Sequence, residues 1–247
     1  MGLLLKAGIN FDLINSALLA FVSITLFIFF INYISKINKL FPNYSLQLAG
    51  LIGNTSFLGI PIAIALLPTD TINFTIGFDL GTTIFSWIFG PYLLQETNNN
   101  KPILNFRKLV SSIFNSPASR GILGVLIIYL FGLENILEDF LWIPARIVIY
   151  IAIIVVGARL GIITKSKKIL IPFKKNIKYS LLLKLFIFPI FIYVFCKVLN
   201  FDGTDTTALV LQGGTPSAIS TILMAEAYKK QKDLAAKAFF ITTIFST

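Results

Sequence analysis

The sequence predicts an all-α polytopic membrane protein, and three observations carry this prediction. First, 56% of the 247 residues are apolar and only 13% are charged, and the mean hydropathy is +0.84, far above that of an ordinary soluble domain. Second, the apolar residues form segments of spanning length whose loops alternate in charge. Third, two of these segments contain helix-breaking residues near their middle. No room remains for a separate soluble domain.

Eight apolar segments can be read along the chain. A helix that crosses the hydrocarbon core needs about 20 mostly apolar residues, and the last of the eight is too short. The segments are 14–34, 44–67, 72–95, 118–133, 140–164, 179–199, 206–228 and 233–247. The chain has no histidine and one cysteine, Cys196, which excludes structural disulfides, Cys/His zinc sites and His-based triads within it. No cofactor and no metal are expected.

The loops between these segments alternate strictly between basic and acidic. Four loops carry 15 of the 21 basic residues, namely Lys36 and Lys39; Lys101, Arg107, Lys108 and Arg120; Lys165, Lys167, Lys168, Lys174, Lys175 and Lys178; and Lys229, Lys230 and Lys232. The three loops between them carry only acids, namely Asp70; Glu134, Glu138 and Asp139; and Asp202 and Asp205. Because cytoplasmic loops gather Lys and Arg, the basic loops are predicted to be cytoplasmic. The net charge of +10 therefore reflects topology and indicates no nucleic-acid partner.

The second and seventh segments each contain a cluster that breaks a helix. Residues 53–61 read GNTSFLGIP, and residues 212–217 read QGGTPS. Glycine and proline both disfavour a continuous helix, and irregular backbone at membrane depth survives only where it is buried in protein or lines a cavity. Half-helices beginning near Pro61 and Pro216 are expected to approach the midplane from opposite sides with their N-termini at the centre. The alternative is a pair of kinked helices with packing glycines.

Two helix N-termini at the midplane favour an anionic ligand. Their free N–H groups and helix dipoles suit a carboxylate, and neither break contains Asp or Glu. The candidate substrate-binding residues are Asn54, Thr55, Ser56, Gly59, Pro61, Gly213, Gly214, Thr215, Pro216 and Ser217, with further hydroxyls from Ser220 and Thr221. The opposing C-terminal ends leave open a bound cation as well.

An internal repeat supports this arrangement. An offset of 160 residues without gaps pairs residues 82–86 with 242–246, both reading TTIFS, and also pairs Gly53 with Gly213 and Thr55 with Thr215. The paired segments cross in opposite directions, as an inverted-topology repeat requires.

Asp79 is the intramembrane charge that most favours a function. With Thr82, Thr83 and Ser86 it forms a polar stripe at i, i+3, i+4 and i+7, about 10 Å deep, where a charge costs about 2.5 to 3.5 kcal/mol. We expect it to take part in proton coupling; the alternative is a neutral or paired Asp that aids packing. Three other charged residues lie near segment ends and are expected to extend to the interface, namely Arg159, Lys184 and Lys197, and the deeper Arg146 is expected to do the same.

These motifs resemble the auxin efflux carrier family of membrane transporters, which includes plant PIN-type carriers and bacterial malate or malonate permeases. The resemblance spans essentially the whole chain. It rests on Gly53-Asn54 followed by residues 58–61 (LGIP), and on Pro216 followed by Ala225, Tyr228 and Asp233. It implies two inverted five-helix repeats with two broken crossover helices, of whose ten spans eight are present here. Asn54 matches a carboxylate-binding Asn of plant members, whereas Gly214 and Ser217 stand where a second Asn would be sought.

The resemblance also implies a division of the chain. Residues 1–95 form an N-terminal repeat that lacks its first two helices, residues 96–117 form a cytoplasmic basic linker, and residues 118–247 form a C-terminal repeat whose last helix is cut short. The expected partners are a small organic anion, a coupling proton or sodium ion and the lipid bilayer, and a homodimer is left open. The abundance of Ile, Phe, Asn and Lys points to a microbial source and a bacterial inner membrane.

Three function classes remain. The first, and the one we favour, is a secondary carrier that moves a small organic anion by alternating access. The second is a sodium/proton antiporter or sodium-coupled symporter of related fold, for which Asp79 is the best argument. The third is an intramembrane aspartyl protease, which needs a second carboxylate sharing the site, and no other Asp or Glu lies deep in a span. No enzyme activity is therefore expected, and the absence of a P-loop motif excludes ATP hydrolysis by this chain.

Overall fold

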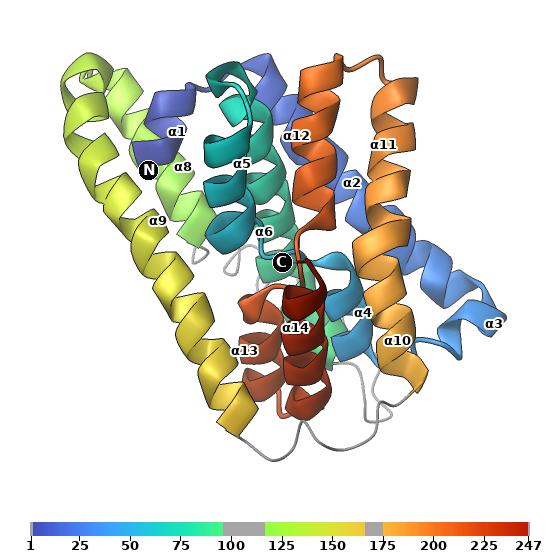
Figure 1. The fold of residues 1–247 in the computed structure, drawn as a ribbon. Helices are drawn as coiled ribbons and strands as arrows, with labels where there is room; N and C mark the ends of the chain where they lie inside the picture. Colours follow the sequence, from blue (N-terminus) through green and yellow to red (C-terminus); the bar gives the residue numbers. More distant parts are fainter. Residues whose placement is uncertain (1, 96–116, 166–174, 247) are drawn as a thin grey trace.

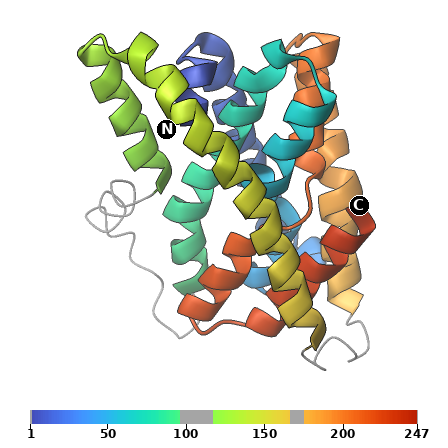
Figure 2. The ribbon, with the colours of Figure 1, turned by 60° about the vertical axis from the view of Figure 1, so that its left-hand side comes forward.

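The part of the protein that the structure describes is built from helices (Figures 1 and 2). The computed structural model describes residues 2–95, 117–165 and 175–246. The long helices are α2 (Phe11–Tyr33), α6 (Ile72–Gln95), α8 (Pro117–Leu130), α9 (Glu134–Lys165), α11 (Phe188–Val198), α12 (Gly203–Gly214) and α14 (Lys232–Ser246). The shorter ones are α1 (Gly2–Ala7), α3 (Ser35–Asn38), α4 (Tyr44–Leu51), η1 (Thr55–Gly59), α5 (Ile60–Leu66), η2 (Thr69–Thr71), α10 (Lys175–Leu182), η4 (Leu183–Ile187) and α13 (Ile219–Ala227). The all-α prediction is confirmed.

Two predicted cytoplasmic loops fall largely outside the described residues. Six of their basic residues are among them, namely Lys101, Arg107, Lys108, Lys167, Lys168 and Lys174. The basic linker at 96–117 therefore stays a prediction.

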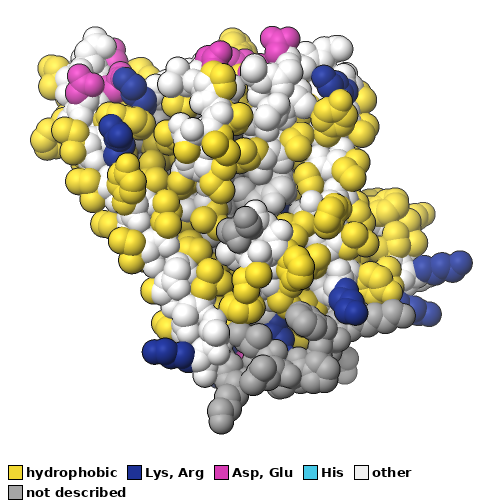
Figure 3. Space-filling model, viewed as in Figure 1, with side chains coloured by type: hydrophobic (Ala, Val, Ile, Leu, Met, Phe, Trp, Pro, Cys, Tyr) yellow, Lys and Arg dark blue, Asp and Glu magenta, His cyan; other side chains and the backbone are white. Residues whose placement is uncertain are grey.

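The outer surface of the helices is strongly apolar. Hydrophobic side chains cover much of the face in Figure 3, and large ones such as Phe29, Ile154 and Phe186 are more than half exposed. Within the described residues, three helical stretches are long and apolar enough to cross a membrane, namely Phe11–Tyr33, Glu134–Lys165 and Asn176–Val198. The other predicted spans are interrupted, are shorter than these, or carry the polar stripe of α6.

Acidic side chains gather at one end of the molecule, which we call the acidic end. Figure 3 shows them at the top, where the turns between α1 and α2, α5 and α6, α8 and α9, and α11 and α12 lie in Figure 1. Asp205, in the first turn of α12, has a raised pKa because it is partly buried and lies near Asp202, Asp12 and Asp70. The position of these acidic turns agrees with the alternating loop charges of the sequence, whereas Glu226 and Asp233 lie beside the α13–α14 turn at the other end.

Close packing of α6 on α2 fixes the orientation of the polar stripe. Gly77 and Gly81 are one turn apart in α6, and a Cβ atom on either would meet the α2 backbone, at Leu13 or at Ala17. Small residues at this spacing let two helix backbones approach closely within a membrane. This contact turns the opposite face of α6, which carries Asp79, toward the centre of the molecule.

Gly81→Ala is expected to destabilise the protein by about 1 to 3 kcal/mol, because the added methyl group must displace the backbone of α2. Gly157→Ala in α9 is the matched control, since a Cβ atom there meets nothing within 4 Å. The unfolding midpoint in detergent measures both effects. Equal midpoints for the two variants would contradict this account of the α2–α6 contact.

The longest helix, α9, lies obliquely across the others (Figure 2). It has 32 residues and begins six residues before the predicted segment at 140. It packs on α1 and η1, and an ion pair joins Lys6 Nζ to Glu138 Oε1 at 2.7 Å. Together α1, α8 and α9 form one side of the molecule in both ribbon views.

Candidate functional site

Two interrupted helices cross near the centre of the molecule. The first pair is α4 and the η1–α5 stretch, separated by residues 52–54; the second is α12 and α13, separated by residues 215–218. An antiparallel backbone bridge joins Gly53 to Ser217. The Asn54 N–H donates to the Pro216 carbonyl oxygen at 2.7 Å, and the Ala218 N–H donates to that of Ile52 at 3.0 Å. Each break therefore satisfies backbone groups of the other, which lipid could not do.

The first break lies earlier than the sequence suggested. The chain resumes a helix at Thr55 as one turn of π-helix and continues into α5, so Pro61 lies in the first turn of α5 and outside the break. The prediction that a half-helix begins near Pro61 holds for the α-helical part, since α5 starts at Ile60 with the proline in its first turn, but the π-helical turn extends the winding back to Thr55. Pro216 does lie in the second break.

The ungapped register of the repeat also fails at the breaks. Gly53 lies in the first break, whereas Gly213 lies in the last turn of α12, and the residue opposite Gly53 is Ser217. The offset of 160 residues does relate the starts of α6 and α14, at Ile72 and Lys232. A repeat in the two halves would therefore need a gap of a few residues between the breaks and the following helices.

Two hydroxyls of the predicted site donate to backbone carbonyl groups. Ser217 Oγ donates to the Ala49 carbonyl oxygen at 2.5 Å, and the Ser217 N–H donates to Thr242 Oγ1 at 3.0 Å. Thr215 Oγ1 donates to the Gln212 carbonyl oxygen at 2.7 Å. The two Ser217 contacts fix the second break against α4 and α14, and the Thr215 contact is made within the end of α12.

The Asp79 side chain of α6 contacts the N-terminus of the η1–α5 stretch. Its Oδ1 accepts hydrogen bonds from Thr55 Oγ1 at 2.6 Å and from Ser56 Oγ at 2.5 Å. The sequence places no acid within either break, but the structure supplies one from α6. A carboxylate at a helix N-terminus is favourable because it faces the positive end of the dipole.

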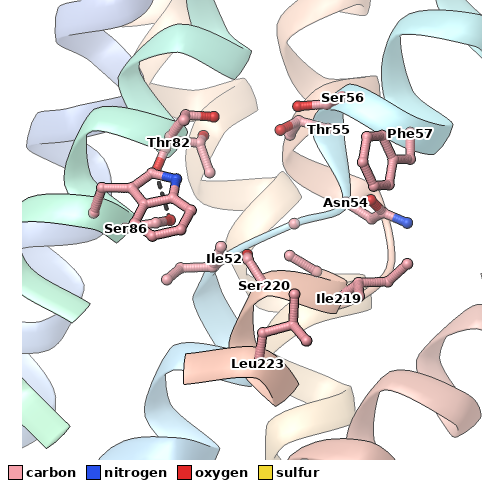
Figure 4. A pocket seen from close by; sticks show the side chains of 14 residues that line it. Ile52, Asn54, Thr55, Ser56, Phe57, Thr82, Ser86, Ile219, Ser220 and Leu223 are labelled. Atoms are coloured by element: carbon pink, nitrogen blue, oxygen red, sulfur yellow. Dashed lines mark hydrogen bonds between the residues drawn. The ribbon is translucent and has the colours of Figure 1, made fainter. Parts of the chain in front are cut away.

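A pocket of about 290 Å³ opens beside the crossing (Figure 4). Its polar lining comes from Asn54, Thr55, Ser56, Thr82, Thr83, Ser86 and Ser220, and its apolar lining includes Ile52, Phe57, Trp87, Ile219 and Leu223. In Figure 4 the Thr82 and Ser86 side chains of α6 face the segment that carries Thr55 and Ser56. The polar stripe of α6 thus forms one wall of the pocket.

Only part of the predicted substrate site lines this pocket. Asn54, Thr55 and Ser56 do so. The predicted residues that do not line it are Gly59, Pro61, Gly213, Gly214, Thr215, Pro216 and Ser217. Thr82, Thr83 and Ser86 line the pocket as well; the sequence identifies them as a polar stripe by their helical spacing but does not assign them to the substrate site. Trp87 and Leu223 carried no sequence signal beyond their hydrophobicity.

Two buried amides at the crossing have free polar atoms. Asn54 is 4% exposed, and its Nδ2 has no hydrogen-bond partner among the described residues. Gln212 is fully buried, and neither amide atom has such a partner; its Oε1 lies against Gly59, where a Cβ atom would collide with it. A buried amide without a partner costs about 1 to 3 kcal/mol; of these two residues, Asn54 lines the adjoining pocket and Gln212 does not.

Lys184 does not reach the membrane interface, which corrects the sequence-based expectation. It is 1% exposed, and its Nζ donates to the carbonyl oxygens of Leu51 at 3.2 Å and Gly213 at 2.9 Å. The side chain departs from η4, a π-helical turn between α10 and α11. Counting residues from a span end missed this, because the direction of the side chain depends on the neighbouring helices.

No group of three or more His, Cys, Asp or Glu that could hold a metal ion occurs in the described part of the chain. The chemistry available at the crossing is therefore that of amides, hydroxyls, helix ends, one carboxylate and one ammonium group. This set can bind and orient a small charged molecule.

Comparisons with known proteins relate the chain to membrane transporters. The model of a family described as membrane transport protein matches residues 104–247, more than half of the chain. An uncharacterized transporter of Methanocaldococcus jannaschii is 23% identical over 205 residues, and one of Methanothermobacter thermautotrophicus is 26% identical over 210 residues. These alignments cover 81% and 82% of this chain, which spans 64% of the length of each relative. The chain belongs to the membrane transport protein family of auxin efflux carriers.

Proposed function

We propose that this protein is a secondary carrier that moves a small organic anion, such as a carboxylate, across the membrane by alternating access. The observation that carries the proposal is the buried Asn54 amide, whose Nδ2 has no partner among the described residues and which lines the pocket beside the crossing. An amide N–H₂ group is a donor; because Nδ2 is enclosed here, we infer that the side chain turns toward the pocket when an acceptor such as a carboxylate oxygen binds.

Helix ends around the pocket favour a negative charge. The η1–α5 stretch begins at Thr55 and α13 begins at Ile219, and both residues line the pocket. The first N–H groups of a helix have no partner within it, and the dipole adds about half a positive charge at each N-terminus. No Asp or Glu is among the lining residues. The Asp79 carboxylate lies at the N-terminus of the η1–α5 stretch and offsets its positive dipole end. At the repeat offset, the buried Phe239 of α14 takes the place of Asp79, so no corresponding carboxylate offsets the N-terminus of α13.

The size and lining of the pocket favour a compact molecule with an apolar part. Its volume of about 290 Å³ equals that of about ten liquid water molecules, which suits a small organic acid. Ile52, Phe57, Trp87 and Leu223 provide the apolar wall. We infer that the carboxylate lies toward Asn54 and Ser220 and the hydrocarbon part toward this wall.

Proton coupling through Asp79 is part of the proposal. A second pocket of about 320 Å³ lies between η1, α6 and α9, and Asp79 lines it. Ser56 and Phe57 line both pockets, so Asp79 contacts the wall that separates them. A carboxylate that binds Ser56 can therefore respond to events in the substrate pocket while it exchanges protons through the second pocket.

The two halves of the chain follow the same order of elements, which supports inverted repeats at 1–95 and 118–247. Each half has a long helix, two half-helices separated by a break, and a further helix. These are α2, α4, α5 and α6 in the first half and α11, α12, α13 and α14 in the second. In Figure 1, α12 begins at the acidic end and α4 begins at the other. Such a pair of opposed repeats is the usual basis of alternating access. The basic loops are proposed to be cytoplasmic, in a cell membrane.

A binding screen tests the anion proposal. Purified protein in detergent is titrated with small mono- and dicarboxylates and with their neutral amides. Carboxylates are expected to bind and amides to bind at least tenfold more weakly, because only the former complement the helix ends. Asn54→Ala is expected to weaken binding of the preferred carboxylate about 10- to 100-fold, as the loss of a hydrogen bond to a charged group predicts.

Asn73→Ala is the control for that variant, since Asn73 lies in the first turn of α6 and outside the pocket. It should leave the affinity unchanged. A folded Asn54→Ala protein with wild-type affinity would remove Asn54 from the site. If no carboxylate binds to the wild-type protein, the anion proposal itself is refuted.

A further inference from the structure

The C-terminal ends of two half-helices meet at the crossing. Helix α4 ends at Leu51 and α12 ends at Gly214. The last carbonyl groups of a helix have no partner within it, and the dipole places about half a negative charge there. In a bilayer these carbonyl oxygens require donors from protein, because lipid has none. Two such ends together form a site for a positive charge.

The ammonium group of Lys184 occupies this position. Its Nζ donates one hydrogen bond to each end, to the Leu51 carbonyl oxygen at 3.2 Å and to that of Gly213 at 2.9 Å. The ring of Phe188 lies beneath it, with the centroid 4.9 Å from Nζ. Among the described residues Lys184 forms no salt bridge, so carbonyl dipoles and an aromatic ring surround the charge.

The surrounding backbone is shaped to admit this ammonium group. A Cβ atom on Gly53 would lie 2.9 Å from Lys184 Nζ, so only glycine leaves room at that position. The π-helical turn Leu183–Ile187 interrupts the regular winding between α10 and α11 at the residue that carries the side chain. Single π-helical turns of this kind occur frequently at functional sites.

We propose that Lys184 is a built-in cation that occupies the place where a coupling alkali ion would bind between the two C-terminal ends. Anion binding on the other side of the crossing then requires no sodium ion. That Lys184 occupies this cation position rests on its geometry alone. That anion binding needs no sodium ion rests also on the proposed function. The inference disfavours the sodium-coupled alternatives, because their cation would compete with a fixed ammonium group.

Chemical rescue tests the occupancy without any substrate. Lys184→Ala removes the ammonium group and leaves space along its path. We expect the unfolding midpoint of the purified protein to fall by about 5 °C or more, and ethylammonium or sodium chloride to restore part of this loss relative to choline chloride at equal ionic strength. Lys184→Met fills the space without a charge, so its midpoint should fall with no rescue by small cations. The wild-type midpoint should not respond to them.

Lys197→Ala is the matched control. Lys197 lies in the last turn of α11 over the ring of Tyr193, away from the crossing, and its removal should neither lower the midpoint as far nor create a cation response. A Lys184→Met protein as stable as the wild type would overturn the proposal. A Lys184→Ala protein that is destabilised but indifferent to every small cation would overturn it as well.

A measurement on the wild-type protein covers the case in which these variants fail to fold. The affinity for the preferred carboxylate should be the same within twofold in sodium chloride and in choline chloride. A tenfold or larger dependence on sodium would refute the built-in cation. If no carboxylate binds in either salt, the proposed function fails, while the midpoint measurements without ligand still decide the part played by Lys184.

Discussion

Gly53→Ala is expected to reduce transport about a hundredfold or more. The added methyl group would collide with Thr215 Oγ1 and lie 2.9 Å from Lys184 Nζ, at the residue that bridges to Ser217. Either the two breaks separate or the ammonium group moves. A displacement of about 1 Å at a site can cost about a hundredfold in rate, and here it would affect the binding pocket and the cation position together. Uptake of the preferred carboxylate into proteoliposomes measures the effect.

Gly214→Ala is the matched control for this substitution. It also adds one methyl group beside a break, but the nearest atoms, on Pro189, are 3.7 and 3.9 Å away, which is ordinary van der Waals contact. Gly214 is the last residue of α12, where alanine is no worse than glycine for the helix. Transport by Gly214→Ala should stay within a few-fold of the wild type. Equal losses in both variants would show that the crossing tolerates no added volume at all, and would refute the specific role given to Gly53.

Asp79→Asn is expected to remove most of the pH dependence of transport. If Asp79 carries the coupling proton, the wild-type rate should change by up to about tenfold per pH unit around its titration, whereas an amide keeps one charge state throughout. The side chain of Asn retains an acceptor oxygen for Thr55 and Ser56, whose hydroxyls now bind Asp79 Oδ1. The start of the first half-helix should therefore keep its shape. Initial uptake rates across a pH series provide the measurement.

Asp205→Asn is the control for this variant, because it shows whether removal of any carboxyl group changes the pH dependence of transport. Asp205 lies at the acidic end in the first turn of α12, and partial burial and neighbouring carboxylates raise its pKa. It lines neither the pocket beside the crossing nor the one reached by Asp79. Asp205→Asn should leave the pH profile in place. An unshifted profile in Asp79→Asn would instead assign Asp79 to packing.

Local composition was enough to place the two breaks. Glycine and proline at the middle of apolar segments predict an interruption, and the requirement that freed backbone groups be satisfied predicts that the two interruptions meet. The bridge between Gly53 and Ser217 shows that they do. The same reasoning placed the start of the first half-helix at Pro61, because composition does not reveal that a π-helical turn can already wind from Thr55.

Tertiary contacts decided what the sequence could not. The stripe that contains Asp79 was visible from its helical spacing, but its contact with Thr55 and Ser56 depends on how α6 rotates against α2. Lys184 was misread for a similar reason: its distance from a span end is compatible with an interfacial position, and only the packing of α4 and α12 around it brings the two carbonyl oxygens within reach. Ser217 and Thr215 showed that a hydroxyl in a break can serve the backbone as readily as a ligand.

The paired breaks also have a mechanical consequence. Hydrogen bonds from Asn54 to Pro216, from Ala218 to Ile52 and from Ser217 to Ala49 join them, and pulling them apart would strand several amides in hydrocarbon at a cost of several kcal/mol each. These hydrogen bonds should therefore hold the four half-helices, α4, η1–α5, α12 and α13, together as one rigid unit. Opening toward one side of the bilayer and then the other should therefore leave this unit intact and change its contacts with other helices, such as that of η1 with α9.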